Sequence, residues 1–182
     1  MSKAIGLVEY RTVSSGIAAS DILVKTADVN IIQAETVCPG KYFALVEGEL
    51  SAVKASIEAA KKAIPDKLID SFVLGNPHDS IFNAIWGTTN VECPKALGVL
   101  ETYSIAGCIV GADIAAKTAQ IQLVELRLAR GMCGKSYMIM TGEVAAVEAA
   151  IEKAKKEAGE NGMFLDSTVI AGPDKKTWEK IL

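Results

Sequence analysis

The sequence is poor in the residues that build conventional metal and acid–base sites. Its 182 residues include four cysteines and one histidine, and no two cysteines form a Cys-x-x-Cys pattern. A histidine cluster for zinc is therefore excluded, and a Ser-His-Asp triad could use only His78. The closely spaced cysteines by which one chain usually holds an iron–sulfur cluster are absent too.

Long apolar runs and excess positive charge are also lacking. No apolar run approaches the roughly 20 residues that a membrane helix needs, and the polar start Met1-Ser2-Lys3 does not predict a signal peptide. A net charge of −3 argues against a nucleic-acid partner, which would require a clustered basic surface. We therefore expect a cytoplasmic protein with reduced cysteines that binds neither nucleic acid nor membrane.

The chain repeats itself along its whole length. Ala4-Ile5-Gly6-Leu7-Val8-Glu9 returns as Ala96-Leu97-Gly98-Val99-Leu100-Glu101, and further matches follow in the same order. Matches in one order throughout a chain indicate tandem duplication. We predict one domain over residues 1–90 and a second over residues 91–182, joined by a polar linker at 87–94.

Each copy alternates short β runs with two alanine-rich helical segments. Half of the residues are apolar but only 5% are aromatic, so the predicted cores are aliphatic. The order βαββαβ predicts an α+β fold made of two ferredoxin-like units, each an antiparallel sheet with helices packed on it. The predicted strands are 4–9, 29–35, 42–47 and 71–74, then 96–101, 121–128, 136–141 and 168–170; the helices are 13–27, 50–63, 105–119 and 144–158.

A cysteine stands in a tight turn of the first copy, Thr36-Val37-Cys38-Pro39-Gly40-Lys41. Pro39 restricts one backbone angle and Gly40 tolerates positive φ, so a turn is predicted whose tip holds Cys38 outward. A second loop, Gly131-Met132-Cys133-Gly134-Lys135, carries another cysteine. Taken alone, a cysteine in a Pro-Gly turn is more often a turn residue than a ligand, and both interpretations remain open.

Three motifs together carry a resemblance: the helix end Asp21–Ala27 and its repeat Asp113–Ala119, a Gly-Lys pair after each second strand, and Gly-Glu ahead of each second helix. From Ala4 to about Ile181 the chain resembles the shell-protein domain of bacterial microcompartments, and two copies in tandem resemble the trimeric class. The resemblance implies a non-enzymatic shell component, a homotrimer that forms a pseudohexameric tile among other shell proteins. It also implies that Lys25 and Lys117 pack tile edges.

The Cys38 turn resembles more specifically the iron–sulfur-carrying members found in propanediol-utilising microcompartments. The resemblance implies that Cys38, one per chain, binds a 4Fe–4S cluster on the three-fold axis, for electron transfer or cluster delivery to encapsulated redox enzymes. Three-fold symmetry collects three thiolates at one point and leaves one iron for another ligand, with Cys133 as a candidate. The residues expected at the central pore are Val37, Cys38, Pro39, Gly40, Lys41, Gly131, Met132, Cys133 and Gly134.

Other functions remain open at this level. A cluster-free shell pore could conduct or gate small metabolites, and a tandem ferredoxin-like module could bind a regulatory small molecule. An enzyme with a cysteine nucleophile is the weakest alternative, because no neighbouring base can be named. Among the remaining candidates, Cys108 is expected to be a small core residue, Cys93 a linker residue without a role, and His78 a capping or packing residue.

Overall fold

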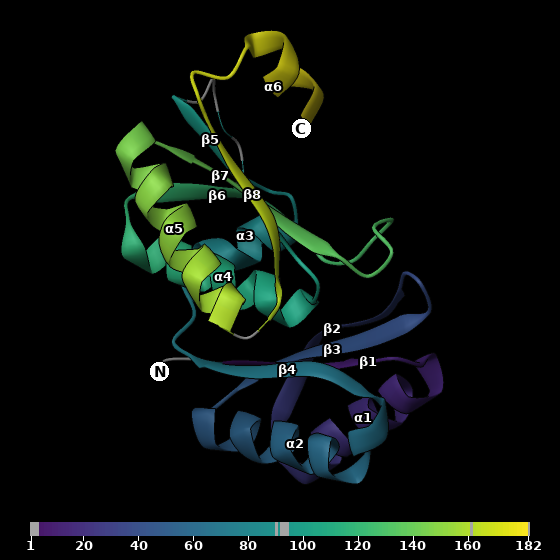
Figure 1. Cartoon of the computed structure of the whole chain (residues 1–182). Coiled ribbons are helices and arrows are strands. Elements are labelled where there is room, and N and C mark those ends of the chain that lie inside the picture. Colours follow the sequence, from purple (N-terminus) through teal and green to yellow (C-terminus); the bar gives the residue numbers. More distant parts are fainter. Residues whose placement is uncertain (1–3, 90, 92–94, 161, 182) are drawn as a thin grey trace. The chain divides into compact units, whose positions relative to one another are not determined.

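The chain folds into two compact units, shown in Figure 1. The computed structural model describes residues 4–89, 91, 95–160 and 162–181. The first unit comprises Met1–Pro77 with the short segments Ser104–Ala106 and Ala129–Gly134, and the second comprises the remainder from His78 onward. Part of the predicted linker, including Cys93, lies outside the described residues.

The first unit is built as the repeat pattern predicts. Its elements are β1 (Ala4–Tyr10), α1 (Val13–Thr26), β2 (Val29–Val37), β3 (Lys41–Gly48), α2 (Leu50–Ala63), the 3-10 turn η1 (Pro65–Lys67) and β4 (Leu68–Gly75). The strands form one antiparallel sheet in the order β2-β3-β1-β4. Helices α1 and α2 pack side by side on one face of it (Figure 1). This strand order is that of the split-βαβ sandwich, so the predicted fold is confirmed.

The second unit repeats this topology and adds a helix at each end. Its elements are α3 (Ser80–Ile85), β5 (Ala96–Thr102), α4 (Ile105–Thr118), β6 (Ile121–Arg127), β7 (Ser136–Gly142), α5 (Val144–Glu160), β8 (Phe164–Ala171) and α6 (Lys175–Ile181). The sheet order is β6-β7-β5-β8, again antiparallel. Helix α3 packs against β6. Trp178 of α6 packs in a small apolar cluster with Leu97, Val124 and Ile139.

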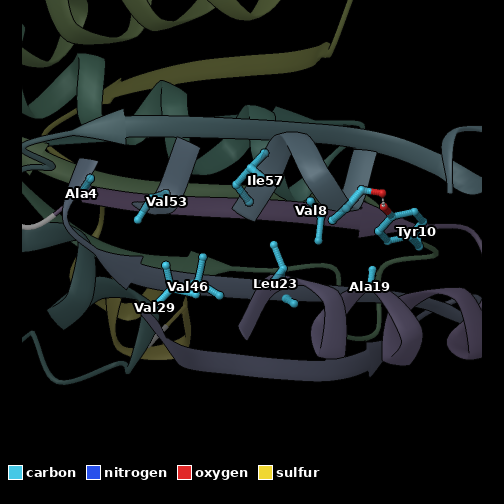
Figure 2. Packing of buried hydrophobic residues seen from close by; sticks show 11 residues of the cluster. Ala4, Val8, Tyr10, Ala19, Leu23, Val29, Val46, Val53 and Ile57 are labelled. Atoms are coloured by element: carbon cyan, nitrogen blue, oxygen red, sulfur yellow. Dashed lines mark hydrogen bonds between the residues drawn. The ribbon is translucent and has the colours of Figure 1, made fainter. Parts of the chain in front are cut away.

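The core of the first unit lies between the sheet and its two helices. Successive residues of β1 point to opposite faces, so every second residue contacts the helices. At Gly6 the backbone lies so close to α2 that a Cβ would approach Val53 Cγ1 to 2.6 Å. Figure 2 shows this cluster, in which the Tyr10 hydroxyl donates to the Ala60 carbonyl at 2.8 Å. Its buried members are Ala4, Val8, Tyr10, Ala19, Leu23, Val29, Ala44, Val46, Val53, Ile57 and Ala60.

The last strand of each copy is longer than predicted. Strand β4 spans Leu68–Gly75 and pairs with all of β1, from Ala4 opposite Gly75 to Tyr10 opposite Leu68. Strand β8 does the same with β5. The partner strand sets these lengths through its hydrogen bonds, whereas the local sequence predicted only residues 71–74 and 168–170. No helix in the described parts of the chain combines the length and hydrophobicity needed to cross a membrane.

Candidate metal centre

The Cys38 turn joins two paired strands and exposes its thiol. Strand β2 ends at Val37 and β3 begins at Lys41, and these two residues face each other in the register. The Gly40 N–H donates to the Val37 carbonyl at 2.9 Å, the Cys38–Pro39 peptide is cis, and Gly40 has φ +98°. Val37 is buried while Cys38 is exposed. The predicted turn and the outward thiol are therefore both present in the structure.

The second cysteine loop has a different backbone. Three of its residues have positive φ, Gly131 (71°), Cys133 (52°) and Gly134 (87°), and so does Ala129 (56°) just before the loop. Non-glycine residues rarely adopt such angles, because the Cβ then crowds the backbone. Cys133 is exposed like Cys38, but its loop is longer and more contorted than the simple turn that the sequence similarity of the two loops suggested.

The structure brings the two cysteine loops together within the first unit. The Lys41 ammonium donates to the Gly134 carbonyl at 3.3 Å, and the Arg130 guanidinium bonds the Glu35 carboxylate at 2.6 Å. Between the loops lies an open hollow of about 360 Å³, lined by Thr36, Val37, Cys38, Pro39, Gly40, Arg130 and Gly131. Residues far apart in the sequence thus form one surface around the Cys38 thiol.

A buried carboxylate lies beneath this surface. Glu9 is 0% exposed, and its two oxygens accept hydrogen bonds from Lys41 Nζ at 3.0 Å and from the Ile105 N–H at 3.0 Å. Burial raises the pKa of Glu9, and Lys41 and the Ile105 N–H only partly oppose that rise, while the Asp70 carboxylate adds to it. Sequence reasoning missed Glu9, although an acidic residue at the end of the apolar run 4–8 was a usable signal.

Lys41 is one of two cations close to the Cys38 turn. Its ammonium is bonded to the Glu9 carboxylate and donates to the Gly134 carbonyl. Arg130 is the second cation beside the turn, and its guanidinium side chain is largely exposed. Arg130 is therefore the more exposed of the two cations, and its guanidinium is bonded to the Glu35 carboxylate.

The two predicted edge lysines have unequal surroundings. Lys25 bonds Asp21 at 2.6 Å on an exposed face of α1. Lys117 bonds Asp113 at 2.7 Å, but the Asp113 side chain is only 6% exposed and also accepts the His78 N–H at 2.9 Å. The duplicated Asp-Lys motif therefore forms a surface pair in one copy and a partly buried anchor for the backbone at His78 in the other.

The remaining cysteine and histidine candidates are structural in character. Cys108 is completely buried in α4, and burial raises the pKa of its thiol, as expected for a core residue. The His78 ring lies 2.8 Å from the Ser80 hydroxyl at the start of α3, which agrees with the expected capping or packing role.

The BMC domain family matches this chain twice, over residues 4–77 and 96–173. The chain belongs to this family. The bacterial microcompartment shell protein PduT of Citrobacter freundii is 37% identical over 182 residues, which cover all of this chain and 99% of that protein. The predicted family and its tandem-domain class are therefore confirmed.

Solved structures agree with this assignment. A crystal structure of a microcompartments protein from Desulfitobacterium hafniense DCB superposes with a TM-score of 0.87 at 41% identity, covering 98% of this chain and 99% of that one. The fused permuted hexameric shell protein of the RMM microcompartment gives a TM-score of 0.68 at 21% identity, covering 87% of this chain and 82% of the other. The second similarity bears on the fold alone.

Proposed function

We propose that the chain is a structural, non-enzymatic tile of a bacterial microcompartment shell and that three copies jointly bind one 4Fe–4S cluster through Cys38. The shell role is supported by the tandem BMC domains and by the full-length similarity to a microcompartment shell protein. Packing among other shell proteins, at edges that carry Lys25 and Lys117, belongs to the same proposal. The observation that carries the metal role is the exposed Cys38 thiol at the tip of a strand-to-strand turn.

The donor set fits such a cluster only when chains are combined. Among the described residues of one chain, no three His, Cys, Asp or Glu side chains gather into a metal site. Cyclic symmetry would bring equivalent exposed thiols to one axis, and cysteine thiolates are the usual ligands of iron–sulfur clusters. Three Cys38 thiolates would leave one iron for another ligand, and Cys133 supplies a second exposed thiol on the neighbouring loop.

The chain itself positions the ligand. The paired ends of β2 and β3 hold Cys38 outward, and Arg130 lines the hollow beside the turn. When bound, the cluster would supply one-electron transfer at a potential tuned by solvent exposure and by hydrogen bonds to its sulfurs. We propose that this chemistry serves electron transfer across the shell, or delivery of the cluster to redox enzymes inside it.

The test is an anaerobic purification of the full chain, followed by visible absorption, EPR after reduction, and iron and sulfide analysis per trimer. About four irons per three chains, lost in Cys38→Ser and retained in the buried-cysteine control Cys108→Ala, would support the shared cluster. Loss in Cys133→Ser as well would add that thiol to the ligand set. A trimer without iron after reconstitution would refute the metal role and leave a cluster-free pore.

The shell role has its own test. Overexpressed chain, examined by electron microscopy of cells and by solution scattering, should form extended sheets or tubes, because tiles associate through their edges in two dimensions. Discrete small particles that never extend would contradict the tile and favour the alternative, a ferredoxin-like module that binds a regulatory small molecule.

A further inference from the structure

Lys41 lies between a buried carboxylate and the second cysteine loop. Its side chain is 18% exposed, its ammonium is 3.0 Å from Glu9 Oε1, and it also donates to the Gly134 carbonyl at 3.3 Å. We call this arrangement of Glu9, Lys41 and Gly134 the Lys41 clasp. Lys41 is three residues beyond Cys38, and Gly134 is the residue after Cys133, so the clasp joins the two thiol-bearing loops.

The buried Glu9 carboxylate requires a positively charged partner. Glu9 is shielded from water, and its carboxylate accepts hydrogen bonds from the Lys41 ammonium and the Ile105 N–H. Removing one partner of a buried ion pair is strongly unfavourable, because the other charge remains in a low-dielectric surrounding. Lys41, normally a mobile surface side chain, is therefore held in one position beneath the turn.

The other end of the clasp depends on the lack of a side chain at Gly134. A Cβ on that residue would lie 2.8 Å from Lys41 Cε, 2.8 Å from Lys41 Nζ and 3.2 Å from the Cys38 carbonyl oxygen. At Gly131 in the same loop, φ is also positive but a Cβ would meet nothing within 4 Å. The loop backbone therefore touches the Cys38 turn at Gly134, and a side chain at this position would separate the two loops.

The second copy has the same residue types but no clasp. Glu101 and Lys135 are the counterparts of Glu9 and Lys41 in the repeat, yet they form no ion pair in the part of the chain that the structure describes. Neither residue is fully buried. The duplicated fold therefore forms without this bridge, and the bridge occurs only where it joins the two cysteine loops.

We propose that Lys41 is a positioning residue of the metal centre: by bridging Glu9 and Gly134, it sets the placement of the Cys38 and Cys133 loops relative to each other. The effect of Lys41 on bound iron rests on the proposed function. Its effect on the placement of the two loops does not, and that effect can be measured on metal-free protein. The matched control is Lys135→Met, which removes the equivalent lysine of the second copy.

The first measurement is backbone hydrogen exchange of the metal-free full chain, for wild type, Lys41→Met, Lys41→Arg and Lys135→Met. We expect residues 36–41 and 129–134 to exchange about tenfold faster in Lys41→Met, because the contacts that oppose local opening are lost. Lys41→Arg should restore most of the protection, and Lys135→Met should leave both loops unchanged. Equal protection in wild type and Lys41→Met would overturn the proposal.

One further variant guards against a folding defect, and a second measurement distinguishes positioning of the metal from a merely structural effect. If Lys41→Met fails to fold, the double variant Glu9→Gln/Lys41→Met removes both charges, and it should show the same loop exposure. In reconstituted protein, Lys41→Met should shift the EPR signal of the reduced cluster while Lys135→Met does not, and an identical signal would contradict the positioning role. Absence of iron in wild type would refute the proposed function but leave the exchange result decisive for the clasp.

Discussion

Replacing Gly16 by alanine tests how tightly β3, the strand that follows the Cys38 turn, is packed onto the first helix. Gly16 lies in α1, where a Cβ would come 2.3 Å from Tyr42 Cδ1 and 2.4 Å from Tyr42 Cβ. Rotation of the ring could relieve the first contact but not the second, because the Tyr42 Cβ is bonded directly to the backbone of β3. The helix and the strand that follows Lys41 would therefore have to move apart.

The expected magnitude combines two opposing effects. Alanine in a helix interior is favoured over glycine by about 1 kcal/mol. Overpacking a well-filled core costs about 1–3 kcal/mol, and a contact against a fixed Cβ belongs at the upper end of that range. We therefore expect Gly16→Ala to lower the free energy of unfolding by about 2 kcal/mol, the difference between the two.

Gly111 of α4 provides the matched control. A Cβ there would meet its nearest atom, Met138 Cε, at 3.7 Å, which is ordinary contact. Only the helix preference then remains, so Gly111→Ala should raise the free energy of unfolding by up to about 1 kcal/mol. Urea denaturation followed by far-UV circular dichroism measures both variants. A Gly16→Ala variant as stable as wild type, or a strongly destabilised Gly111→Ala, would refute the packing argument.

Two further predictions concern buried carboxylates. Because burial raises the pKa of Glu9, the stability it contributes is complete below the ordinary glutamate pKa and is lost as the pH rises through the raised value. Glu9→Gln should therefore gain stability relative to wild type as the pH increases through that window in a urea series, and a relative loss would mean that Lys41 outweighs burial. Separately, Asp113→Ala should cost about 1–3 kcal/mol by leaving the His78 N–H unpaired, whereas the exposed Asp21→Ala should cost about 0.5 kcal/mol or less in the same denaturation assay.

The fold could be predicted because its signals are local and occur twice. Helical spacing predicts one face made of Val53, Ile57, Ala60 and Ile64. The first three are buried in α2, and Ile64 is half-buried just after the helix ends. The Pro-Gly pair at Pro39 and Gly40 predicts a turn between strands, and the turn is there. Repetition of the whole pattern then makes each copy support the interpretation of the other.

The surroundings of the candidate site could not be predicted, because they depend on contacts between distant segments. Glu9 and Lys41 are 32 residues apart, and Lys41 and Gly134 are 93 apart. Nothing in the chain near Lys41 indicates that its ammonium would be engaged by a buried carboxylate. The length of β4 was underestimated for a similar reason, since its ends are set by hydrogen bonds to β1.

The sequence by itself determined the duplicated ferredoxin-like fold and the cysteine at the tip of a turn, because periodicity, turn chemistry and repetition are properties of neighbouring residues. It indicated the family through the resemblance of its repeated motifs to known shell-protein domains. Only the tertiary structure decided which equivalent residues of the two copies differ in burial and in contacts. The two Asp-Lys pairs, at Asp21 and Asp113, have the same spacing, yet only Asp113 is buried and holds a distant backbone N–H. Burial depends on what packs against a residue, and a duplicated sequence meets different neighbours in its two copies.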